Sequence, residues 1–345
     1  MGQKLFIRAD ATTAIGIGHI MRCIALAQAW QKDAGDVTFV TACQSNFLHR
    51  RLLEEGFQVI TLEKPYPHPD DWQVMSRALK ARPVAWIVLD GYHLDTAYQR
   101  RMKESGHRVM IIDDTAHLDY YVDDILLNQN INAEKLSYSC DPNTRLLLGT
   151  EYVLLRSEFL AWRNWRRETP EVARRILVTL GGGDPHNVTL QVIKALKMIS
   201  TSDLEVKITV GASNPHAGIL KDALPPAPSN MSMIHNIKNM ADLMAWADAA
   251  VSAGGSTCWE MCFMKLPLAT IILADNQQRI SEGVERTGIG ICCGWYHELD
   301  VTSLAKRFAN LIHDRDCRSK MSEKAGELVD GLGTKRTIDK MAAIG

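Results

Sequence analysis

The sequence predicts an α/β protein with two doubly wound parallel-sheet domains, each Rossmann-like. Short runs of apolar and β-branched residues alternate with longer stretches whose apolar residues recur at helical spacing. The predicted strands are nearly all apolar, as expected when helices cover both faces of a parallel sheet. The same alternation starts again after residue 172, and 345 residues are enough for two hydrophobic cores. Together these observations predict two βαβ-type domains that face each other across a cleft.

The elements of the first half follow from these patterns. Amphipathic helices are predicted over residues 19–32 and 95–105. The predicted strands cover residues 4–10, 37–42, 58–62, 86–90, 108–113 and 125–128. A charged segment without strand character, 161–172, is predicted to be a linker or a connecting helix. We therefore expect the first domain to span residues 1–160.

The second half repeats the alternation. Its predicted strands cover residues 175–180, 204–210, 231–235, 249–252, 268–273 and 290–293. From residue 301 the chain is predicted to be helical, because Leu304, Phe308, Leu311 and Ile312 fall on one helical face. We expect the second domain to span residues 173–345 and to include these C-terminal helices.

The composition argues against several classes of protein. With 39 basic and 40 acidic residues the net charge is -1, so no overall field attracts nucleic acid or an anionic membrane. No run approaches the ~18 apolar residues of a membrane helix, and the N-terminus leads into a strand without a signal segment. None of the eight cysteines forms a Cys-x-x-Cys pair, so we expect free thiols and no metal or other cofactor. Since no long apolar edge or heptad repeat is present, we expect a cytoplasmic monomer that binds neither nucleic acid nor membranes.

A glycine-rich turn follows the first predicted strand. Gly16 and Gly18 allow the backbone to approach a ligand closely, and doubly wound sheets bind ligands beyond the carboxyl ends of their strands. As a dinucleotide fingerprint this turn is weak, because the position of the third glycine is Met21. The turn therefore predicts a ligand contact of another kind.

His19 and Arg22 begin the helix that follows this turn. A neutral imidazole in a cleft takes a proton from water near pH 7, so His19 is a candidate general base. The alternative is a helix-opening histidine that is bonded to backbone. Asp10, at the end of the strand, has three possible roles that stay open: to orient His19, to bind hydroxyl groups of a ligand, or to cap the turn.

A second glycine-rich turn follows the first strand of the second half, over residues 181–187. Three consecutive glycines are entropically costly, which favours close approach of a ligand near Gly182 over a plain turn. Asp184 completes this turn, and Asn187 can start the next helix.

The third turn carries the sharpest signal. Gly254 and Gly255 end a strand, and Ser256 and Thr257 open a helix whose free amides attract phosphate. Glu260 lies one turn further on the same side and can hold the two hydroxyls of a ribose. The simpler interpretation, N-capping by Ser256 with Glu260 as a partner of the helix dipole, is compatible with phosphate binding.

Two further strand ends carry polar side chains. Asn276 and Gln277 follow the strand over 268–273 and either hold sugar hydroxyls or amides, or simply start a helix. After the strand over 86–90, Tyr92 is a candidate lining residue, and His93 is interpreted as structural or solvent-facing.

Two clusters suggest other functions. Asp113, Asp114 and His117 invite a metal interpretation, which we discount because adjacent carboxylates on an extended chain point in different directions. Trp162 and Trp165 lie among arginines, but the balanced overall charge favours a packed linker over a nucleic-acid contact.

The motifs over residues 8–23, 181–187 and 253–260, in that order, resemble those of the UDP-sugar hydrolases of pseudaminic acid biosynthesis. These hydrolases are related to the MurG-type glycosyltransferases of the GT-B fold, and the resemblance extends to about residue 330. It implies a UDP-linked diacetamido sugar as substrate, held mostly by the second domain while the first closes over the sugar. It further implies hydrolysis at the anomeric carbon with inversion, release of UDP, and no required metal. In that family the residue matching His19 is the proposed base, and Tyr92 and Asn276 match further active-site positions.

The expected mechanism places the diphosphate at the helix start over 254–257, the ribose on Glu260, and a water deprotonated by His19 at the anomeric carbon. The substrate-binding residues that we expect are Asp10, Gly16, Gly18, Arg22, Gly182, Asp184, Asn187, Gly254, Gly255, Ser256, Thr257, Glu260 and Gln277. Two other functions fit the same residues. A glycosyltransferase would use His19 on an acceptor hydroxyl, and a non-catalytic protein would bind the UDP-sugar without turnover.

Overall fold

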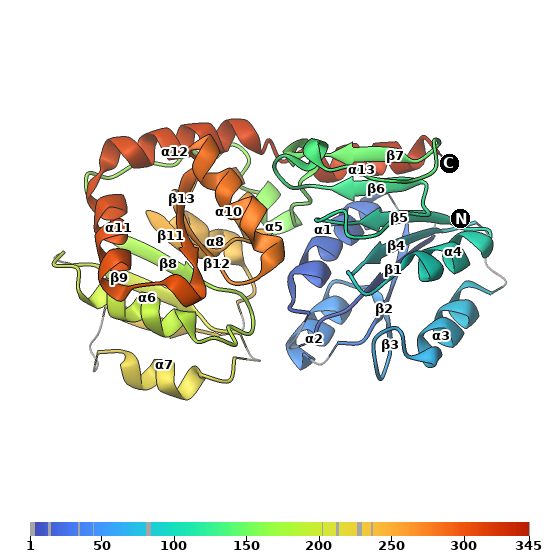
Figure 1. Ribbon diagram of the computed structural model, residues 1–345, viewed down its shortest axis with the longest axis horizontal. Helices are drawn as coiled ribbons and strands as arrows, with labels where there is room; N and C mark the ends of the chain where they lie inside the picture. The colour runs from blue at the N-terminus through green and yellow to red at the C-terminus, as the bar shows by residue number, and fades with distance from the viewer. Residues whose placement is uncertain are drawn as a thin grey trace. The chain divides into compact units, whose positions relative to one another are not determined.

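The computed structural model describes residues 4–12, 15–33, 35–43, 45–80, 84–201, 203–211, 214–225, 230–235 and 237–344. The chain divides into two compact units. Unit 1 comprises Met1–Ser157 and Gly331–Gly345, and unit 2 comprises Glu158–Asp330. Each unit contains one parallel sheet with helices packed against it (Figure 1), which confirms the predicted α/β class.

Unit 1 contains a seven-stranded sheet with the order β3-β2-β1-β4-β5-β6-β7. Its strands are β1 (Lys4–Ala9), β2 (Asp36–Thr41), β3 (Gln58–Thr61), β4 (Trp86–Asp90), β5 (Arg108–Ile112), β6 (Ile125–Asn128) and β7 (Arg145–Leu148). Its helices are α1 (Gly18–Lys32), α2 (Asn46–Glu54), α3 (Pro69–Leu79), α4 (Thr96–Glu104), α13 (Gly333–Ala342) and the 3-10 turns η1 (Ala133–Lys135) and η2 (Thr150–Tyr152). The six predicted strands are present, and β7 is an additional edge strand.

The core of unit 1 lies on both faces of this sheet, because successive residues of a strand point to opposite faces. Leu5 and Ile7 of β1 are buried in one cluster with residues of α1, α2 and α13. Phe6, between them, is buried in another cluster with residues of α3 and α4. The helices after β1 and β4 therefore cover opposite faces.

Unit 2 contains a six-stranded sheet with the order β10-β9-β8-β11-β12-β13. Its strands are β8 (Arg175–Thr179), β9 (Glu205–Thr209), β10 (Met231–Ile234), β11 (Ala249–Ala253), β12 (Leu268–Ile272) and β13 (Gly290–Trp295). Its helices are α6 (Val188–Lys197), α7 (Ala217–Ala223), α8 (Met240–Trp246), α9 (Thr257–Phe263), α10 (Asp275–Thr287), η3 (Tyr296–Glu298), α11 (Val301–His313) and α12 (Arg315–Leu328). The short helix α5 (Ser157–Leu160) spans the boundary between the units. The residues predicted to share one face of α11 are all buried in one cluster with β8 and α6, which confirms that face.

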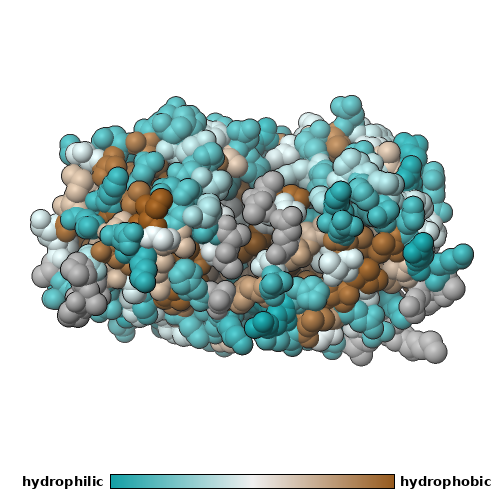
Figure 2. All heavy atoms as spheres, turned by 90° about the horizontal axis from the view of Figure 1, so that it is seen from below, coloured by the Kyte–Doolittle hydropathy of each residue, from teal (hydrophilic) through white to brown (hydrophobic). Residues whose placement is uncertain are grey.

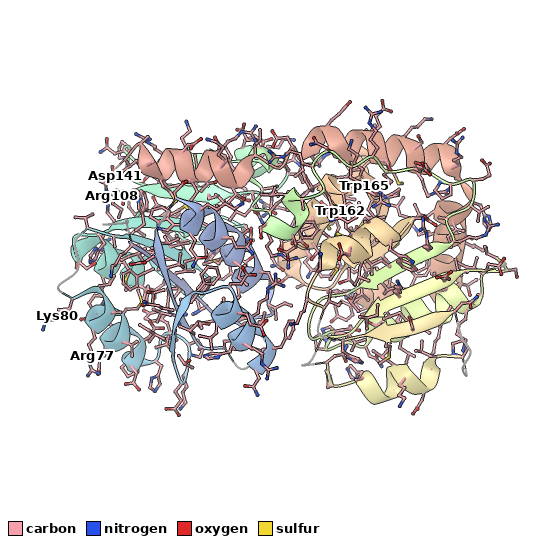
Figure 3. The ribbon with its side chains drawn as sticks, turned by 180° about the vertical axis from the view of Figure 1, so that it is seen from behind. Arg77, Lys80, Arg108, Asp141, Trp162 and Trp165 are labelled. Carbon is pink, nitrogen blue, oxygen red and sulfur yellow. The ribbon has the colours of Figure 1, made fainter. Side chains whose placement is uncertain are left out.

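The segment predicted as a linker is packed onto unit 2. The guanidinium of Arg167 donates to the backbone carbonyls of Met244, Ala247 and Met264, near the ends of α8 and α9. The rings of Trp162 and Trp165, labelled in Figure 3, make an edge contact with centroids 5.3 Å apart. The segment over 161–172 therefore belongs to the second unit and does not separate two domains.

The structure also corrects the assignment of the last helix. We expected α13 in the second domain, but it packs in unit 1. Thr334 accepts a hydrogen bond from the amide of Leu155 at 3.1 Å, and Arg336 donates to the carbonyl of Glu151 at 2.9 Å. A side chain at Gly333 would lie 2.4 Å from the carbonyl oxygen of Val153, so the glycine permits this close packing. The chain thus returns to its first unit at its C-terminal end.

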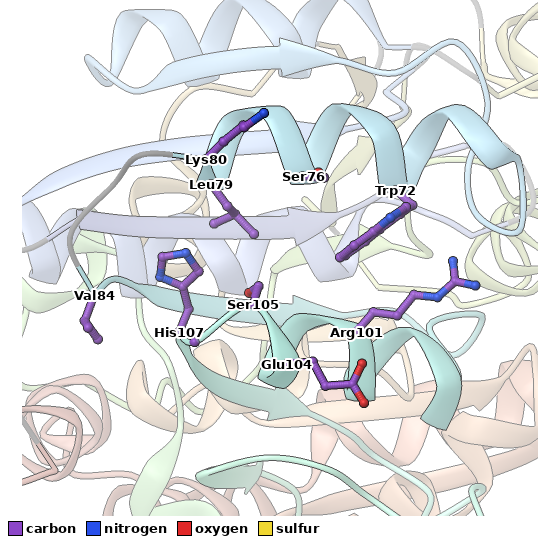
Figure 4. Close-up of a pocket in the computed structure, with 10 residues that line it drawn as sticks. Trp72, Ser76, Leu79, Lys80, Val84, Arg101, Glu104, Ser105 and His107 are labelled. Carbon is purple, nitrogen blue, oxygen red and sulfur yellow. The ribbon is translucent and has the colours of Figure 1, made fainter.

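Hydrophobic and hydrophilic residues are interspersed on the face of the molecule in Figure 2. Within the described residues, no helix combines the length and hydrophobicity that crossing a membrane would require. A pocket of about 490 Å³ lies between α3 and α4 (Figure 4). Its lining includes Trp72, Ser76, Lys80, Arg101, Glu104 and His107. None of the expected site residues lines this pocket, so the candidate site is elsewhere.

Candidate active site

The strand order of unit 1 reverses between β1 and β4. The chain adds β2 and β3 on one side of β1 and then crosses over to begin β4 on the other. Doubly wound sheets bind ligands at the carboxyl ends of the two strands where this reversal occurs. Asp10 directly follows β1, Asp90 ends β4, and His19 is the second residue of α1. The residues predicted from the first motif therefore lie where a ligand is expected.

His19 is held by Asp90. Nδ1 of His19 lies 2.5 Å from Oδ1 of Asp90, and the imidazole is only 8% exposed. Burial alone would raise the pKa of Asp90, but the charge of Arg22 and hydrogen bonds from Arg22 and His19 hold that pKa well below its usual range. An ionised Asp90 accepts a hydrogen bond from the N–H at Nδ1, and in the neutral imidazole this leaves a lone pair on Nε2. Within the described part of the chain, Nε2 has no hydrogen-bond partner, so this nitrogen is available to take a proton.

Arg22 fixes Asp90 from the other side. Its Nε and Nη2 donate to the two oxygens of Asp90, each at 2.7 Å, and its Nη1 donates to both oxygens of Asp114 at 2.7 and 2.8 Å. Arg22 is 6% exposed. We expected this residue to bind substrate, and the structure instead places its guanidinium between two carboxylates.

Tyr92 closes this cluster. Its hydroxyl donates to Oδ2 of Asp114 at 2.7 Å, and its ring meets the ring of His19 edge-on with centroids 5.2 Å apart. Asp113, the neighbour of Asp114, turns to a different partner, Nδ1 of His117 at 2.8 Å. The two adjacent carboxylates thus point in different directions, as the sequence predicted. The structure therefore brings Tyr92 against His19.

Asp10 has other partners than His19. Its Oδ1 accepts from Nη1 of Arg8 at 2.5 Å and from the amide of Ala42 at 2.6 Å, and its Oδ2 lies 2.8 Å from Nε2 of His93. The side chain is fully buried. Of the three roles left open, orienting His19 falls to Asp90. Asp10 instead joins the ends of β1 and β2 to the loop after β4.

The glycine turn before α1 has the conformation that requires glycine. Gly16 has a φ of +79°, in the left-handed region, and its amide donates to the carbonyl of Thr12 at 2.9 Å. Gly18 is the first residue of α1, and the residue before it makes no side-chain cap. Among the described residues, no side chain caps the first amides of α1, which lie at the carboxyl end of β1.

The strand order of unit 2 reverses between β8 and β11. The three predicted motifs of this unit follow β8, β11 and β12, which are neighbours in the sheet. Their loops therefore leave from the same edge. At Gly254 a side chain would lie 2.1 Å from Oγ of Ser281 and 2.9 Å from the carbonyl oxygen of Gln277, so the loop after β11 packs directly on α10. Gly255 has open space around its Cα.

The side chain of the N-cap residue does not cap α9. Ser256 occupies the N-cap position, but its hydroxyl accepts no hydrogen bond from the helix. This differs from the capping interpretation of the sequence. Within the described residues the hydroxyls of Ser256 and Thr257 have no protein partner, and both residues are partly exposed. Glu260, in the first turn of the same helix, is partly exposed as well.

The loop after β8 is closed by Asp184. Its two oxygens accept from the amides of Val188 at 2.8 Å and Thr189 at 2.9 Å, so Asp184 caps α6 and its carboxylate is buried. We expected a substrate contact from Asp184, and its carboxylate is already used by the helix. Asn187 stands at the N-cap position in a left-handed conformation without capping. The backbone of Gly182 packs against Gly211, where an added side chain would lie 2.1 Å from the carbonyl oxygen of Gly182.

The loop after β12 exposes Asn276, the second residue of α10. Oε1 of Gln277 accepts from the amide of Leu273 at 3.0 Å, which ties this side chain to the end of β12. Asn276 therefore faces outward from the same edge as Ser256 and Thr257, whereas Gln277 is partly committed to the turn.

Asp90 and Asp114 are the residues of this candidate site to which sequence reasoning gave no role. They stand at the carboxyl ends of β4 and β5, as Asp10 and Asp113 stand at the ends of β1 and β5. An aspartate at the end of each of β1, β4 and β5 was therefore the available signal. Which of these carboxylates meets His19 depends on the strand order, which the sequence alone does not contain.

Known proteins resemble this chain in sequence and fold. Residues 175–336 match the glycosyltransferase family 28 C-terminal domain. The spore coat polysaccharide biosynthesis protein SpsG of Bacillus subtilis is 24% identical over 333 residues, which is 96% of this chain and 95% of that protein. The UDP-2,4-diacetamido-2,4,6-trideoxy-beta-L-altropyranose hydrolase of Campylobacter jejuni is 24% identical over 293 residues, covering 83% of this chain and 97% of the hydrolase.

Among solved structures, MurG of Acinetobacter baumannii superimposes with a TM-score of 0.66 over 99% of both chains, at 15% sequence identity. The resemblance inferred from the motifs is confirmed, because a relative with the name of that hydrolase aligns with most of the chain. The predicted fold class is also confirmed. The protein has a GT-B-like fold of two Rossmann-like units, and its second unit matches the C-terminal domain of family 28 glycosyltransferases.

Proposed function

We propose that this protein is a nucleotide-sugar hydrolase that cleaves the bond between the anomeric carbon and UDP in a UDP-linked diacetamido-trideoxy sugar. The name of the Campylobacter jejuni relative supports the substrate class. The observation that carries the proposal is the pair of His19 and Asp90, in which Nδ1 is held at 2.5 Å and Nε2 is left without a partner among the described residues. A buried, oriented imidazole of this kind is suited to act as a general base.

In the proposed reaction, Nε2 of His19 removes a proton from a water molecule. The water oxygen forms a bond to the anomeric carbon as the bond from that carbon to the UDP oxygen breaks, and UDP leaves with the electron pair. Asp90 stays ionised and stabilises the imidazolium that forms. Since water attacks opposite the leaving group, the configuration at the anomeric carbon inverts.

Unit 2 is proposed to hold the UDP. Three features support this assignment: the uncapped start of α9, the hydroxyls of Ser256 and Thr257 that have no partner among the described residues, and the absence of a side chain at Gly255. Backbone amides at a helix start favour an anion and stabilise the charge that develops on a departing phosphate. Glu260, one turn along α9, is proposed to bind the ribose hydroxyls, and Asn276 to bind a polar group of the sugar.

The test of the base is the substitution His19→Asn. The carboxamide of asparagine replaces Nδ1 as the donor to Asp90 but supplies no nitrogen in place of Nε2. We expect the rate of UDP release to fall about 10²- to 10⁴-fold, the usual contribution of a general base, while calorimetry shows an unchanged affinity for UDP. His117→Asn is the matched control, because His117 also pairs with an aspartate through Nδ1, but its Nε2 is bonded to the carbonyl of Tyr92. A near-normal rate in His19→Asn would remove His19 from the mechanism.

The test of the reaction is product analysis. Incubation of the protein with UDP-diacetamido sugars and no added acceptor is expected to release UDP and free sugar in equal amounts. Proton NMR during the first turnovers is expected to show the inverted anomer. Tight UDP binding without any sugar release would identify a binding protein and contradict the proposal.

A glycosyltransferase is the second candidate. The match of residues 175–336 to a glycosyltransferase domain favours it, and fold alone does not separate the two functions. In this case His19 would deprotonate a hydroxyl of an acceptor molecule instead of water. UDP release that depends on an added acceptor would support the transferase and contradict the hydrolase.

A further inference from the structure

Unit 1 contains two hydrogen-bonded chains with the same order of residue types. Each runs from a histidine through an aspartate, an arginine and a second aspartate to a tyrosine. The chain already described contains His19, Asp90, Arg22, Asp114 and Tyr92. The other contains His93, Asp10, Arg8, Asp71 and Tyr98. The proposed mechanism uses only the first.

The second chain is as tightly made as the first. Nη1 of Arg8 donates to Asp10 at 2.5 Å, and its Nε donates to Asp71 at 2.9 Å. The hydroxyl of Tyr98 donates to the other oxygen of Asp71 at 2.6 Å. Arg8, Asp10, Asp71 and Tyr98 are all fully buried. Their side chains therefore hold the histidine at the end of the chain in one orientation.

Each of the two aspartates holds the histidine that follows the other strand. Asp90 ends β4 and holds His19 from the segment after β1, whereas Asp10 follows β1 and holds His93 from the segment after β4. Both pairs therefore lie at the carboxyl ends of the two strands between which the sheet order reverses, the position where such sheets bind ligands. His93 is placed in the same part of the fold as the proposed base.

His93 offers one free nitrogen. Its Nε2 lies 2.8 Å from Asp10, and its side chain is 22% exposed. Within the described residues Nδ1 has no hydrogen-bond partner. Gly91 leaves the space beside the ring open, since a side chain there would lie 2.7 Å from Cε1 and 3.1 Å from Nδ1 of His93.

The protonation states of Asp10 and His93 determine whether Nδ1 of His93 donates or accepts a hydrogen bond. Burial alone would raise the pKa of Asp10, but hydrogen bonds from His93 and Arg8, and the charge of Arg8, lower it to about 2. The carboxylate is therefore ionised at neutral pH and accepts a hydrogen bond from the N–H at Nε2 of His93. In a neutral imidazole the remaining nitrogen is then a hydrogen-bond acceptor.

We propose that His93 is a substrate-binding residue whose Nδ1 accepts a hydrogen bond from an amide N–H or a hydroxyl of the sugar. The inference rests on the proposed function, because the proposed reaction brings the anomeric carbon of the sugar to His19, in the same part of unit 1 as His93. An acetamido group presents the N–H donor that such a nitrogen binds. His93 selects among UDP-sugars, and His19 performs the proton transfer.

The test is the substitution His93→Gln, assayed with a UDP-diacetamido sugar. The amide nitrogen of glutamine takes the place of Nε2 and keeps the donor to Asp10, but no acceptor replaces Nδ1. We expect KM to rise about 3- to 10-fold, as for the loss of one hydrogen bond, and kcat to fall less than KM rises. The affinity for UDP, which carries no sugar, is expected to equal that of the wild type in calorimetry.

Tyr98→Phe is the control for an effect that passes through the buried chain. It removes the hydrogen bond at the far end, to Asp71, and is expected to leave KM unchanged. An equal rise of KM in Tyr98→Phe would mean that His93 acts by positioning, which overturns the direct contact. An unchanged KM in His93→Gln also overturns it, as does a loss of kcat equal to that of His19→Asn. Absence of UDP release by the wild-type protein would instead refute the proposed function.

Discussion

The strand ends of the two units carry different chemistry on the same type of sheet. In unit 1 the carboxyl ends of β1, β4 and β5 carry buried or partly buried aspartates, each bonded to an arginine or a histidine. In unit 2 the corresponding loops carry glycines and hydroxyls, and the carboxylate of Asp184 is turned inward to cap α6. One edge is built from ionised pairs, and the other from uncharged donors.

This difference has a physical meaning. Buried charges are unfavourable unless they are paired and hydrogen-bonded. The desolvation of the charged groups in unit 1 therefore offsets much of the free energy that their pairing contributes to folding. The network is suited to hold an imidazole in one tautomer for proton transfer. A diphosphate, in contrast, is repelled by carboxylates and attracted by amides and hydroxyls. The comparison therefore supports the proposed division, with proton chemistry in unit 1 and anion binding in unit 2.

The largest effect is expected from Asp90→Asn. The amide still accepts from Arg22, but it no longer carries the charge that fixes the proton on Nδ1 of His19 and stabilises the imidazolium. We expect kcat for UDP release to fall about 10²- to 10⁴-fold, with the affinity for UDP unchanged. Steady-state kinetics and calorimetry on the same preparation would measure both. If UDP affinity fell together with kcat, the division of labour between the units would be wrong.

Asp114→Asn is the matched control for this substitution. Asp114 contacts Arg22, Tyr92 and Asn130, but it does not contact His19. Its replacement disturbs the same buried network one residue further from the proposed base. We expect a smaller loss of kcat than for Asp90→Asn, and equal losses would show that the network as a whole, not the pair of Asp90 and His19, sets the rate.

The next effect concerns stability, and it tests whether the buried aspartates of unit 1 are ionised because they are paired. Asp123, just before β6, is 5% exposed, and neither of its oxygens has a partner among the described residues. Burial raises the pKa of Asp123 from 3.8 to about 7. Its neutral form is favoured in the folded state, so the related stability is complete below pH 4 and is lost as the pH rises through about 7. Asp123→Asn should therefore stabilise the protein at pH 8, by up to about 4 kcal/mol, and leave it nearly unchanged at pH 4.

The neighbouring Asp124 provides the opposite control. Its oxygens accept from Lys103 at 2.7 and 2.8 Å and from the amide of Val109 at 2.7 Å. Asp124→Asn removes the charge that Lys103 pairs with and is expected to lower the midpoint of thermal unfolding at pH 8, where Asp123→Asn raises it. Destabilisation by both substitutions would contradict the account of Asp123.

The sequence predicts the repeated scaffold well, for a physical reason. Strands that are covered on both faces are continuous apolar runs, so β4 and β6 were predicted with their observed bounds. The strand β7 was missed: it has only four residues, and Arg145 and Leu146 are both exposed, so it lacks that pattern. The same argument explains why the apolar face of α11 was predicted and confirmed.

The partners of the site residues were less predictable. His19 was identified from a glycine turn, but its partner Asp90 comes from a strand that is distant in sequence and adjacent only through the sheet order. The return of α13 to unit 1 depends on a close contact at Gly333, which no periodicity reveals. His93 was interpreted as structural or solvent-facing, because nothing in the sequence shows that Asp10 holds it. Local pattern predicts elements, whereas side-chain pairing requires the topology.

The smallest effect is expected from Ser256→Ala and Thr257→Val in unit 2. Each removes one hydroxyl that has no protein partner in the described part of the chain, so the folded protein loses little. A hydrogen bond to a charged phosphate contributes about 1.5 kcal/mol or more, so each substitution should weaken UDP binding about tenfold in calorimetry while kcat changes little at saturating substrate. Thr287→Val is the control, because that hydroxyl, in the last turn of α10, bonds the carbonyl of Gly283 at 2.8 Å and is expected to leave UDP affinity unaltered. A fall in kcat with unchanged UDP affinity in the Ser256 and Thr257 variants would place proton chemistry on the uncharged edge and reverse the comparison.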